Sequence, residues 1–249
     1  MSEHKAVLQI KELKEIANLK PYVIVGVPEV GLVGTIVTSY LIRQLAMQEI
    51  GYVDSESFPQ IMVVHASEPK YPVRIFQHDD IISFHSEIPL APRASSYLAS
   101  EIVSYSVAKG ARAVIGITGI PSKRRIESSE ALQVFAISNT KDMLERAKDA
   151  GAEPLEEGMI LGSYASLLKH CMAMGIPNLT LLAESFPEFP DPEAALSVIK
   201  VLSRMINIDI DTKPLLAESE ELRLRLRELM HRTQQSMQEA VKLAPSAYA

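Results

Sequence analysis

One stretch, in which an apolar run meets a glycine-rich turn and then a helical pattern, constrains this chain more than any other feature. Residues 22–25, Tyr-Val-Ile-Val, end at Gly26 and are typical of a buried strand flanked by breakers. The turn that follows contains Gly31 and Gly34, and an apolar helical pattern covers residues 32–47. A strand, a glycine turn and a helix in this order open many nucleotide-binding α/β folds, so the turn either holds a phosphate or supports the fold.

The rest of the first 212 residues continues this alternation of strands and helices. Residues 6–20 predict a short strand followed by a loop or helical turn, and apolar runs predict further strands at 61–64, 73–76, 81–85, 113–118, 134–138 and 178–183. Helical patterns cover 91–109, 140–150, 162–174 and 192–206. Because strands alternate with helices, we expect an α/β domain with a mostly parallel sheet and helices on both faces. The turn Asp79-Asp80 predicts an antiparallel hairpin within it.

The carboxyl-terminal segment has a different pattern. From Pro214 onward the strand signals stop, and apolar residues recur at seven-residue spacing to form one face of a long helix. Thr233 and Ser236 make that face polar, so packing back on the domain and a coiled coil between subunits stay equally open. We therefore divide the chain into an α/β core (1–212), an amphipathic helix (213–244) and a free tail (245–249).

Composition excludes several classes of function. The 249 residues carry a net charge of −6, whereas a nucleic-acid surface needs clustered excess Lys and Arg. The one basic run, Lys123-Arg124-Arg125, is followed by acidic residues and predicts a solvated loop. Cys171 is the single cysteine, which excludes an internal disulfide and predicts a buried apolar side chain in a reducing compartment. The amino terminus lacks a secretion signal and breakers interrupt the apolar stretch 22–42, so we expect a cytoplasmic protein without a membrane span.

The glycine turn fits known phosphate-binding motifs poorly. A dinucleotide fingerprint requires Gly-x-Gly-x-x-Gly, but Pro28 occupies the second glycine position after Gly26 and has no amide hydrogen to offer. No Lys-Ser/Thr pair follows, as a Walker loop would require. We therefore expect Gly26, Pro28, Gly31 and Gly34 to serve a structural turn, with anion binding as the alternative.

Other polar residues give only weak signals of chemistry. His65 and His85 could converge, but no histidine pair has the spacing of a metal site, so the sequence predicts neither metal nor cofactor. Glu184, Glu188 and Asp191 follow a core strand, where a catalytic carboxylate could lie. We favour loop polarity and a helix cap for these three, and we assign no catalytic residue.

The last residues offer a docking signal. Tyr248 stands one residue from the terminal carboxylate, and an aromatic ring beside an anion can enter a pocket that has an apolar wall and a basic group. The long helix before the tail would project it from the domain.

Several stretches resemble the archaeal proteasome assembly chaperone family, which is related to the second eukaryotic proteasome assembly chaperone. They are Gly-Val-Pro-Glu-Val-Gly-Leu-Val-Gly at 26–34, Val-Ile-Gly-Ile-Thr-Gly at 114–119, and the stretches 175–184 and 190–195. The resemblance implies a fold like that of purine nucleoside phosphorylases without their reaction, and homo-oligomers that dock on the α subunits of the proteasome core particle.

In this family the docking element is a terminal hydrophobic-Tyr-any tripeptide, which corresponds here to Ala247, Tyr248 and Ala249. Ala247 is a minimal hydrophobic residue, so several tails would have to act together. The resemblance also leaves room for a paralogous partner. Two alternatives stay open, namely a nucleoside- or phosphate-binding enzyme on the phosphorylase-like fold and an activator of the mature core particle.

Overall fold

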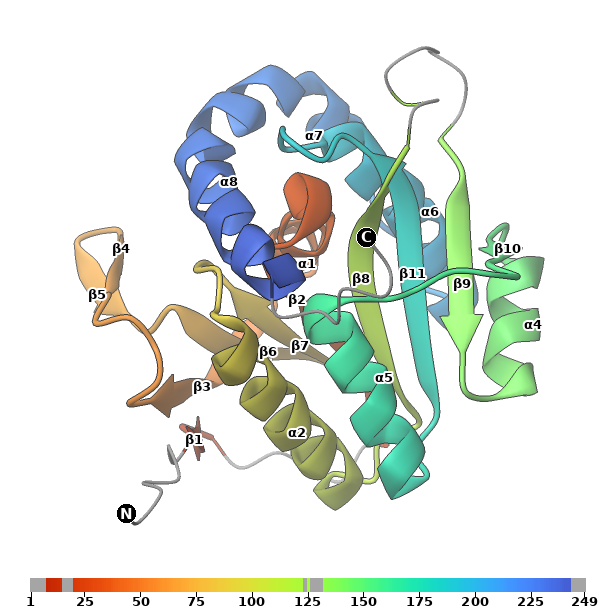
Figure 1. Cartoon of the computed structure of the whole chain (residues 1–249), viewed down its shortest axis with the longest axis horizontal. Helices are drawn as coiled ribbons and strands as arrows, with labels where there is room; N and C mark the ends of the chain where they lie inside the picture. Colours follow the sequence, from red (N-terminus) through yellow and green to blue (C-terminus); the bar gives the residue numbers. More distant parts are fainter. Residues whose placement is uncertain (1–7, 15–19, 123–124, 126–131, 243–249) are drawn as a thin grey trace.

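The apolar run at residues 22–25 lies in the middle of a nine-stranded sheet (Figure 1). The computed structural model describes residues 8–14, 20–122, 125 and 132–242. Within these residues the strand order is β1-β3-β6-β7-β2-β8-β11-β9-β10. The four central strands run parallel to one another and are β7 (Ile81–Ser86), β2 (Tyr22–Gly26), β8 (Ala113–Pro121) and β11 (Asn178–Ser185).

The flanking strands add antiparallel pairs to this parallel centre. On one side lie β6 (Val73–His78), β3 (Gln48–Ser55) and β1 (Leu8–Glu12), each antiparallel to its neighbour. On the other side β9 (Val134–Ser138) is antiparallel to β11, and the short β10 (Glu153–Pro154) is parallel to β9. A separate ribbon of β4 (Val63–His65) and β5 (Glu68–Lys70) stands apart from the sheet.

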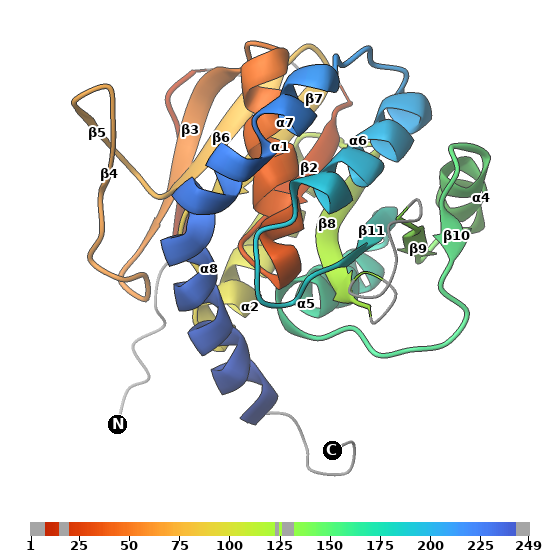
Figure 2. The ribbon, with the colours of Figure 1, turned by 90° about the horizontal axis from the view of Figure 1, so that it is seen from above.

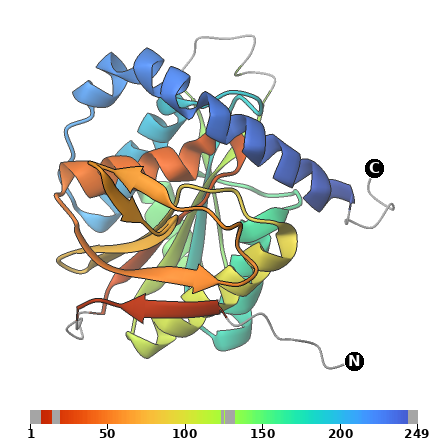
Figure 3. The same ribbon diagram turned by 90° about the vertical axis from the view of Figure 1, so that its left-hand side faces the viewer.

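Helices cover both faces of the sheet, as Figure 3 shows from the side. One face packs against α2 (Pro92–Ala108) and α5 (Gly162–Met174). The other packs against α1 (Val33–Gln44), which follows the short 3₁₀ turn Val30–Leu32, and against α4 (Lys141–Asp149) and α6 (Pro192–Ile206). Because apolar surface is buried on both sides, β2 and β11 are buried along their whole length. The predicted α/β fold with a mostly parallel central sheet is confirmed.

Three local predictions need correction. The strand β3 was not predicted, because it begins with exposed polar residues and carries an irregularity between Glu49 and Gly51. The predicted strand at 61–64 is only the exposed ribbon strand Val63–His65. The single helix predicted from residue 213 is two helices, α7 (Lys213–Ala217) and α8 (Ser219–Lys242), which are separated at Glu218.

Helix α8 packs back on the domain. Two of its own residues, Met230 and Thr233, are buried against the domain. Three leucines of its apolar face contact the core cluster that includes α1 and α6, and they are Leu222, Leu226 and Leu229. Near its end the Ser236 hydroxyl donates a hydrogen bond of 2.7 Å to the Leu90 carbonyl just before α2. The helix therefore crosses from the α6 side of the sheet to the beginning of α2 (Figure 2).

Candidate functional site

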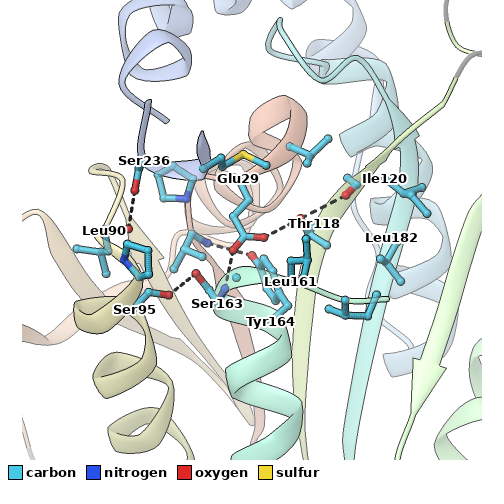
Figure 4. A pocket seen from close by; sticks show the side chains of 18 of the residues that line it. Glu29, Leu90, Ser95, Thr118, Ile120, Leu161, Ser163, Tyr164, Leu182 and Ser236 are labelled. Atoms are coloured by element: carbon cyan, nitrogen blue, oxygen red, sulfur yellow. Dashed lines mark hydrogen bonds between the residues drawn. The ribbon is translucent and has the colours of Figure 1, made fainter. Parts of the chain in front are cut away.

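A cavity of about 340 Å³ lies at the carboxyl ends of β2 and β8, beside the end of α8 (Figure 4). Six segments form its wall. They are the turn 27–30, the end of β8, Leu182 of β11, the beginning of α2 with Leu90, the stretch 159–164, and Ser236 with Met237 of α8. The carboxyl edge of parallel strands is where ligand sites of open α/β sheets occur. This cavity is therefore the first candidate for a site.

Glu29 is the one charged residue among the described residues that line this cavity. Its Oε1 accepts a 2.8 Å hydrogen bond from the backbone N–H of Ser163, and its Oε2 accepts a weaker one of 3.4 Å from the Thr118 hydroxyl. The whole side chain is half-buried, but its carboxyl group is enclosed by protein. Burial raises the pKa of Glu29 from its ordinary 4.5 to about 7, and the hydrogen bonds from Ser163 and Thr118 oppose this rise.

The local sequence explains how a carboxylate reaches this position. Leu161, at the N-cap of α5, has no side-chain acceptor for the free amides of the first turn, and Glu29 supplies one from a distant part of the chain. Gly162 lets the carboxylate approach, since a Cβ at this position would lie 2.7 Å from Oε1. The positive end of the helix also favours a negative group there.

Hydroxyl groups complete the polar part of the wall. The Ser95 hydroxyl donates to the Ser163 hydroxyl at 2.5 Å, which ties α2 to α5. Tyr164 is fully buried, and its hydroxyl accepts a 3.2 Å hydrogen bond from the Val27 amide. Burial, followed by the nearby charge of Glu29, holds the pKa of Tyr164 well above its usual range, so this phenol acts as a neutral support for the turn.

The glycine turn packs tightly in the structure. A Cβ on Gly26 would collide with the Gly34 carbonyl oxygen, and a Cβ on Gly34 would collide with the Ile117 carbonyl oxygen. Gly31 has φ +61°, a conformation that side chains rarely adopt. Pro28 lines the cavity next to Glu29. Anion binding by this turn stays a prediction, and the carboxylate that projects from the same turn works against it.

The two histidines that the sequence singled out do share a second cavity, of about 530 Å³, beneath α8. The His65 ring lies 2.9 Å from the Glu87 carboxylate and 3.2 Å from an Arg74 nitrogen, and Arg74 also pairs with Glu87. His85 is buried with its Nδ1 2.8 Å from the Thr38 hydroxyl, and burial lowers its pKa to about 4. A neutral His85 and a paired His65 indicate structural roles.

The three acidic residues that the sequence singled out do not form a site at the cavity, and Glu184 lies within β11 rather than after it. Glu184 accepts hydrogen bonds from the Ser122 hydroxyl at 2.7 Å and from the Gln133 amide at 3.2 Å, and Glu188 is exposed. Asp191 is fully buried and caps α6 through the Ala194 amide at 3.2 Å, which confirms the predicted cap.

Arg125 and Cys171 test two further predictions. Arg125 is buried against Asp191, with nitrogen–oxygen distances of 2.8 and 3.0 Å, and this corrects the prediction of a solvated basic loop at that residue. Lys123 and Arg124 lie outside the described residues. Cys171 is buried as predicted, and burial raises the pKa of its thiol to about 12.

Two classes of feature are absent from the part of the chain that the structure describes. It contains no group of three or more His, Cys, Asp or Glu side chains that could hold a metal ion. Within the same ranges, no helix has both the length and the apolar character needed to cross a membrane. The predicted docking residues Ala247, Tyr248 and Ala249 lie outside the described residues.

Sequence analysis missed Glu29 as a site residue. Its hydrogen-bond partner Ser163 lies 134 residues further along the chain, so no local pattern connects the two residues. A usable signal was present, since a single charged residue in a glycine- and proline-rich turn directly after a buried strand marks the carboxyl edge of the sheet.

Residues 23–230 match the family model described as the PAC2 family. The chain belongs to the PAC2 family. The resemblance seen in the sequence is thereby confirmed, and the matched region extends from β2 into α8.

Several relatives share the PAC2 fold over nearly their whole length. PbaA of Pyrococcus furiosus, an archaeal homolog of proteasome-assembly chaperone, superposes with a TM-score of 0.84 at 29% identity, covering 93% of this chain and 100% of its own. An uncharacterized protein of Methanocaldococcus jannaschii is 27% identical over 96% of this chain and 97% of its own length. PbaB of Pyrococcus furiosus, an archaeal proteasome activator, shows the same fold with a TM-score of 0.75 at 21% identity over 89% of this chain and 98% of its own.

Proposed function

We propose that this protein is a non-enzymatic assembly chaperone or docking scaffold of the proteasome. The observation that carries the proposal is the likeness to PbaA, which spans that entire chain and is described as an archaeal homolog of proteasome-assembly chaperone. The match to the PAC2 family over residues 23–230 supports it.

The docking element of this proposal is the terminal tripeptide Ala247-Tyr248-Ala249. Its carboxylate would pair with a lysine of an α subunit, and the Tyr248 ring would enter the same cleft beside Ala247. The structure supports this role through α8, whose buried residue Met230 anchors the helix while its last described turns extend past the body of the domain (Figure 3).

The small side chain of Ala247 makes a single tail a weak ligand, so the proposal includes a homo-oligomer. Several linked tails that engage several pockets can raise the overall affinity by about 10²–10⁴-fold over one site. A paralogous subunit could supply some of these tails.

A non-enzymatic role also agrees with the carboxyl-edge cavity. No histidine is among its described lining residues, and the Ser95 and Ser163 hydroxyls bond to each other. The alternative of a nucleoside- or phosphate-binding enzyme is tested by thermal unfolding with phosphate and with nucleosides. A rise of several degrees with one of them would favour that alternative.

A pull-down with purified α subunits tests the tail. We expect the full chain to retain α subunits, and we expect deletion of Tyr248-Ala249 or the substitution Tyr248→Ala to abolish retention. Ala247→Leu enlarges the apolar residue and should strengthen binding, which makes it a matched control. Light scattering verifies that each variant keeps the oligomer of the full chain, and unchanged binding after the deletion would contradict the tail mechanism.

Activation of the mature core particle would use the same tail, so binding alone does not separate it from assembly. A peptide-hydrolysis assay with mature core particle makes the distinction. An assembly factor leaves the hydrolysis rate unchanged, whereas an activator raises it.

A further inference from the structure

We propose that the cavity at the carboxyl edge binds a small molecule that has an apolar body and a positively charged, hydrogen-bond-donating nitrogen, which pairs with Glu29. This ligand site is separate from the proposed tail docking and does not depend on it.

The shape and the lining of the cavity favour a small, mainly apolar ligand. Its volume of about 340 Å³ lies within the range of small-molecule sites in proteins. Most of the wall is apolar, and four of its regions contribute large apolar side chains. They are the turn with Val27 and Val30, β8 with Ile120, the stretch before α5 with Met159, and α8 with Met237. A few polar groups at one end of an apolar cavity are the usual arrangement for fixing a ligand's orientation.

The polar end selects for positive charge. Glu29 is the single charged side chain among the described lining residues, and Figure 4 shows its carboxylate directed toward Ser163 and Thr118 at the base of the cavity. A ligand carboxylate or phosphate would meet this group without a cation among those lining residues to offset it. An ammonium group instead gives a charge-assisted hydrogen bond, the stronger class of such bonds.

Glu29 also has acceptor capacity left for a ligand. Above about pH 7, where the Glu29 carboxylate is ionised, it offers about four acceptor positions, and the hydrogen bonds from the Ser163 amide and the Thr118 hydroxyl occupy two of them. Those two bonds hold the carboxylate in place before a ligand arrives, so little further ordering is needed on binding.

The ligand would also touch α8. Ser236 and Met237 contribute to the wall, and Ser236 is fixed by its hydrogen bond to the Leu90 carbonyl. A bound molecule therefore lies between the sheet edge and the helix, and its presence should be detectable at Met237.

The simpler explanation is that Glu29 only caps α5. The substitution Glu29→Gln separates the two, because the amide oxygen can still accept the Ser163 N–H while the negative charge is lost. If capping is the whole role of Glu29, amines bind equally to the wild type and to this variant, or to neither.

The test is NMR of the full chain with labelled methionine methyl groups, using benzylamine as the probe and benzyl alcohol and benzoate as matched neutral and anionic controls. We expect benzylamine to shift the Met159 and Met237 signals in a saturable manner, benzyl alcohol to bind more weakly, and benzoate not to bind. In Glu29→Gln, benzylamine should bind about tenfold or more weakly, and benzyl alcohol should be unaffected.

Three results would overturn the proposal. The first is that benzylamine leaves both methionine signals unchanged. The second is that benzoate binds as tightly as benzylamine, and the third is that Glu29→Gln leaves the affinity for benzylamine unchanged. The order of the three probes in the unmodified protein tests the charge preference even if the variant does not fold. Deletion of Tyr248-Ala249 should leave benzylamine binding intact, so failure of the tail mechanism is distinguishable from failure of this site.

Discussion

The substitution Glu29→Gln should remove a pH dependence from the stability of the fold. Burial raises the pKa of Glu29 from 4.5 to about 7, so between these values the folded state holds a proton that the unfolded state has released. The free energy of unfolding therefore falls as the pH rises through this interval of about 2.5 pH units. At about 1.4 kcal/mol per unit, the free energy of unfolding of the wild type falls by roughly 3–4 kcal/mol between pH 4.5 and pH 7.

The variant carries no titrating group at residue 29, so the comparison isolates this contribution. We expect the unfolding free energies of Glu29→Gln and the wild type to diverge between pH 4.5 and about 7 and to differ by a constant amount above it. Urea unfolding followed by circular dichroism at fixed protein concentration measures both. Glu157→Gln makes the same chemical change at an exposed position and should follow the wild type. Parallel curves for Glu29→Gln and the wild type would show that the pKa of Glu29 is the same in the folded and unfolded states.

Two further pairs of variants test the packing of the turn and of α8. A Cβ on Gly34 would collide with the Ile117 carbonyl oxygen, so Gly34→Ala should destabilise the fold by about 1–3 kcal/mol or more. A Cβ on Gly175 would meet open space, so Gly175→Ala should cost only about 1–2 kcal/mol of backbone strain. Urea unfolding that ranks Gly175→Ala as the less stable variant would contradict this prediction. Met230 is 2% exposed, so Met230→Ala should cost about 2–5 kcal/mol and speed hydrogen exchange along α8. Leu224 is 71% exposed, and Leu224→Ala should leave that exchange unchanged.

Elements with a strong local pattern were predictable from the sequence. The apolar run of β2 and the Asp-Pro-Glu beginning of α6 carry their signals within a few residues, and both occur where predicted. Strand β3 escaped prediction because its pairing with β6 and β1, rather than its own sequence, keeps it in the sheet. The packing of α8 was undecided for the same reason, since the surface that receives its leucines is assembled from α1 and α6.

The site was harder to predict than the fold. Glu29 gains its role from the beginning of α5, and Gly162 provides the necessary space at a position that no local pattern connects with residue 29. Asp191 was predicted as a cap, but its pairing with Arg125 was not, because that contact spans 66 residues. Contacts of this kind depend on the folded topology.

We propose that this PAC2-family protein docks on proteasome α subunits through its terminal residues. The most direct measurement is mass-resolved chromatography of the full chain and of the chain lacking Tyr248-Ala249, each alone and each mixed with purified α subunits. We expect the full chain to elute with α subunits as a larger complex, and we expect the shortened chain to keep its own oligomeric mass and to elute separately. Co-elution of the shortened chain with α subunits at the same complex mass would contradict the proposal.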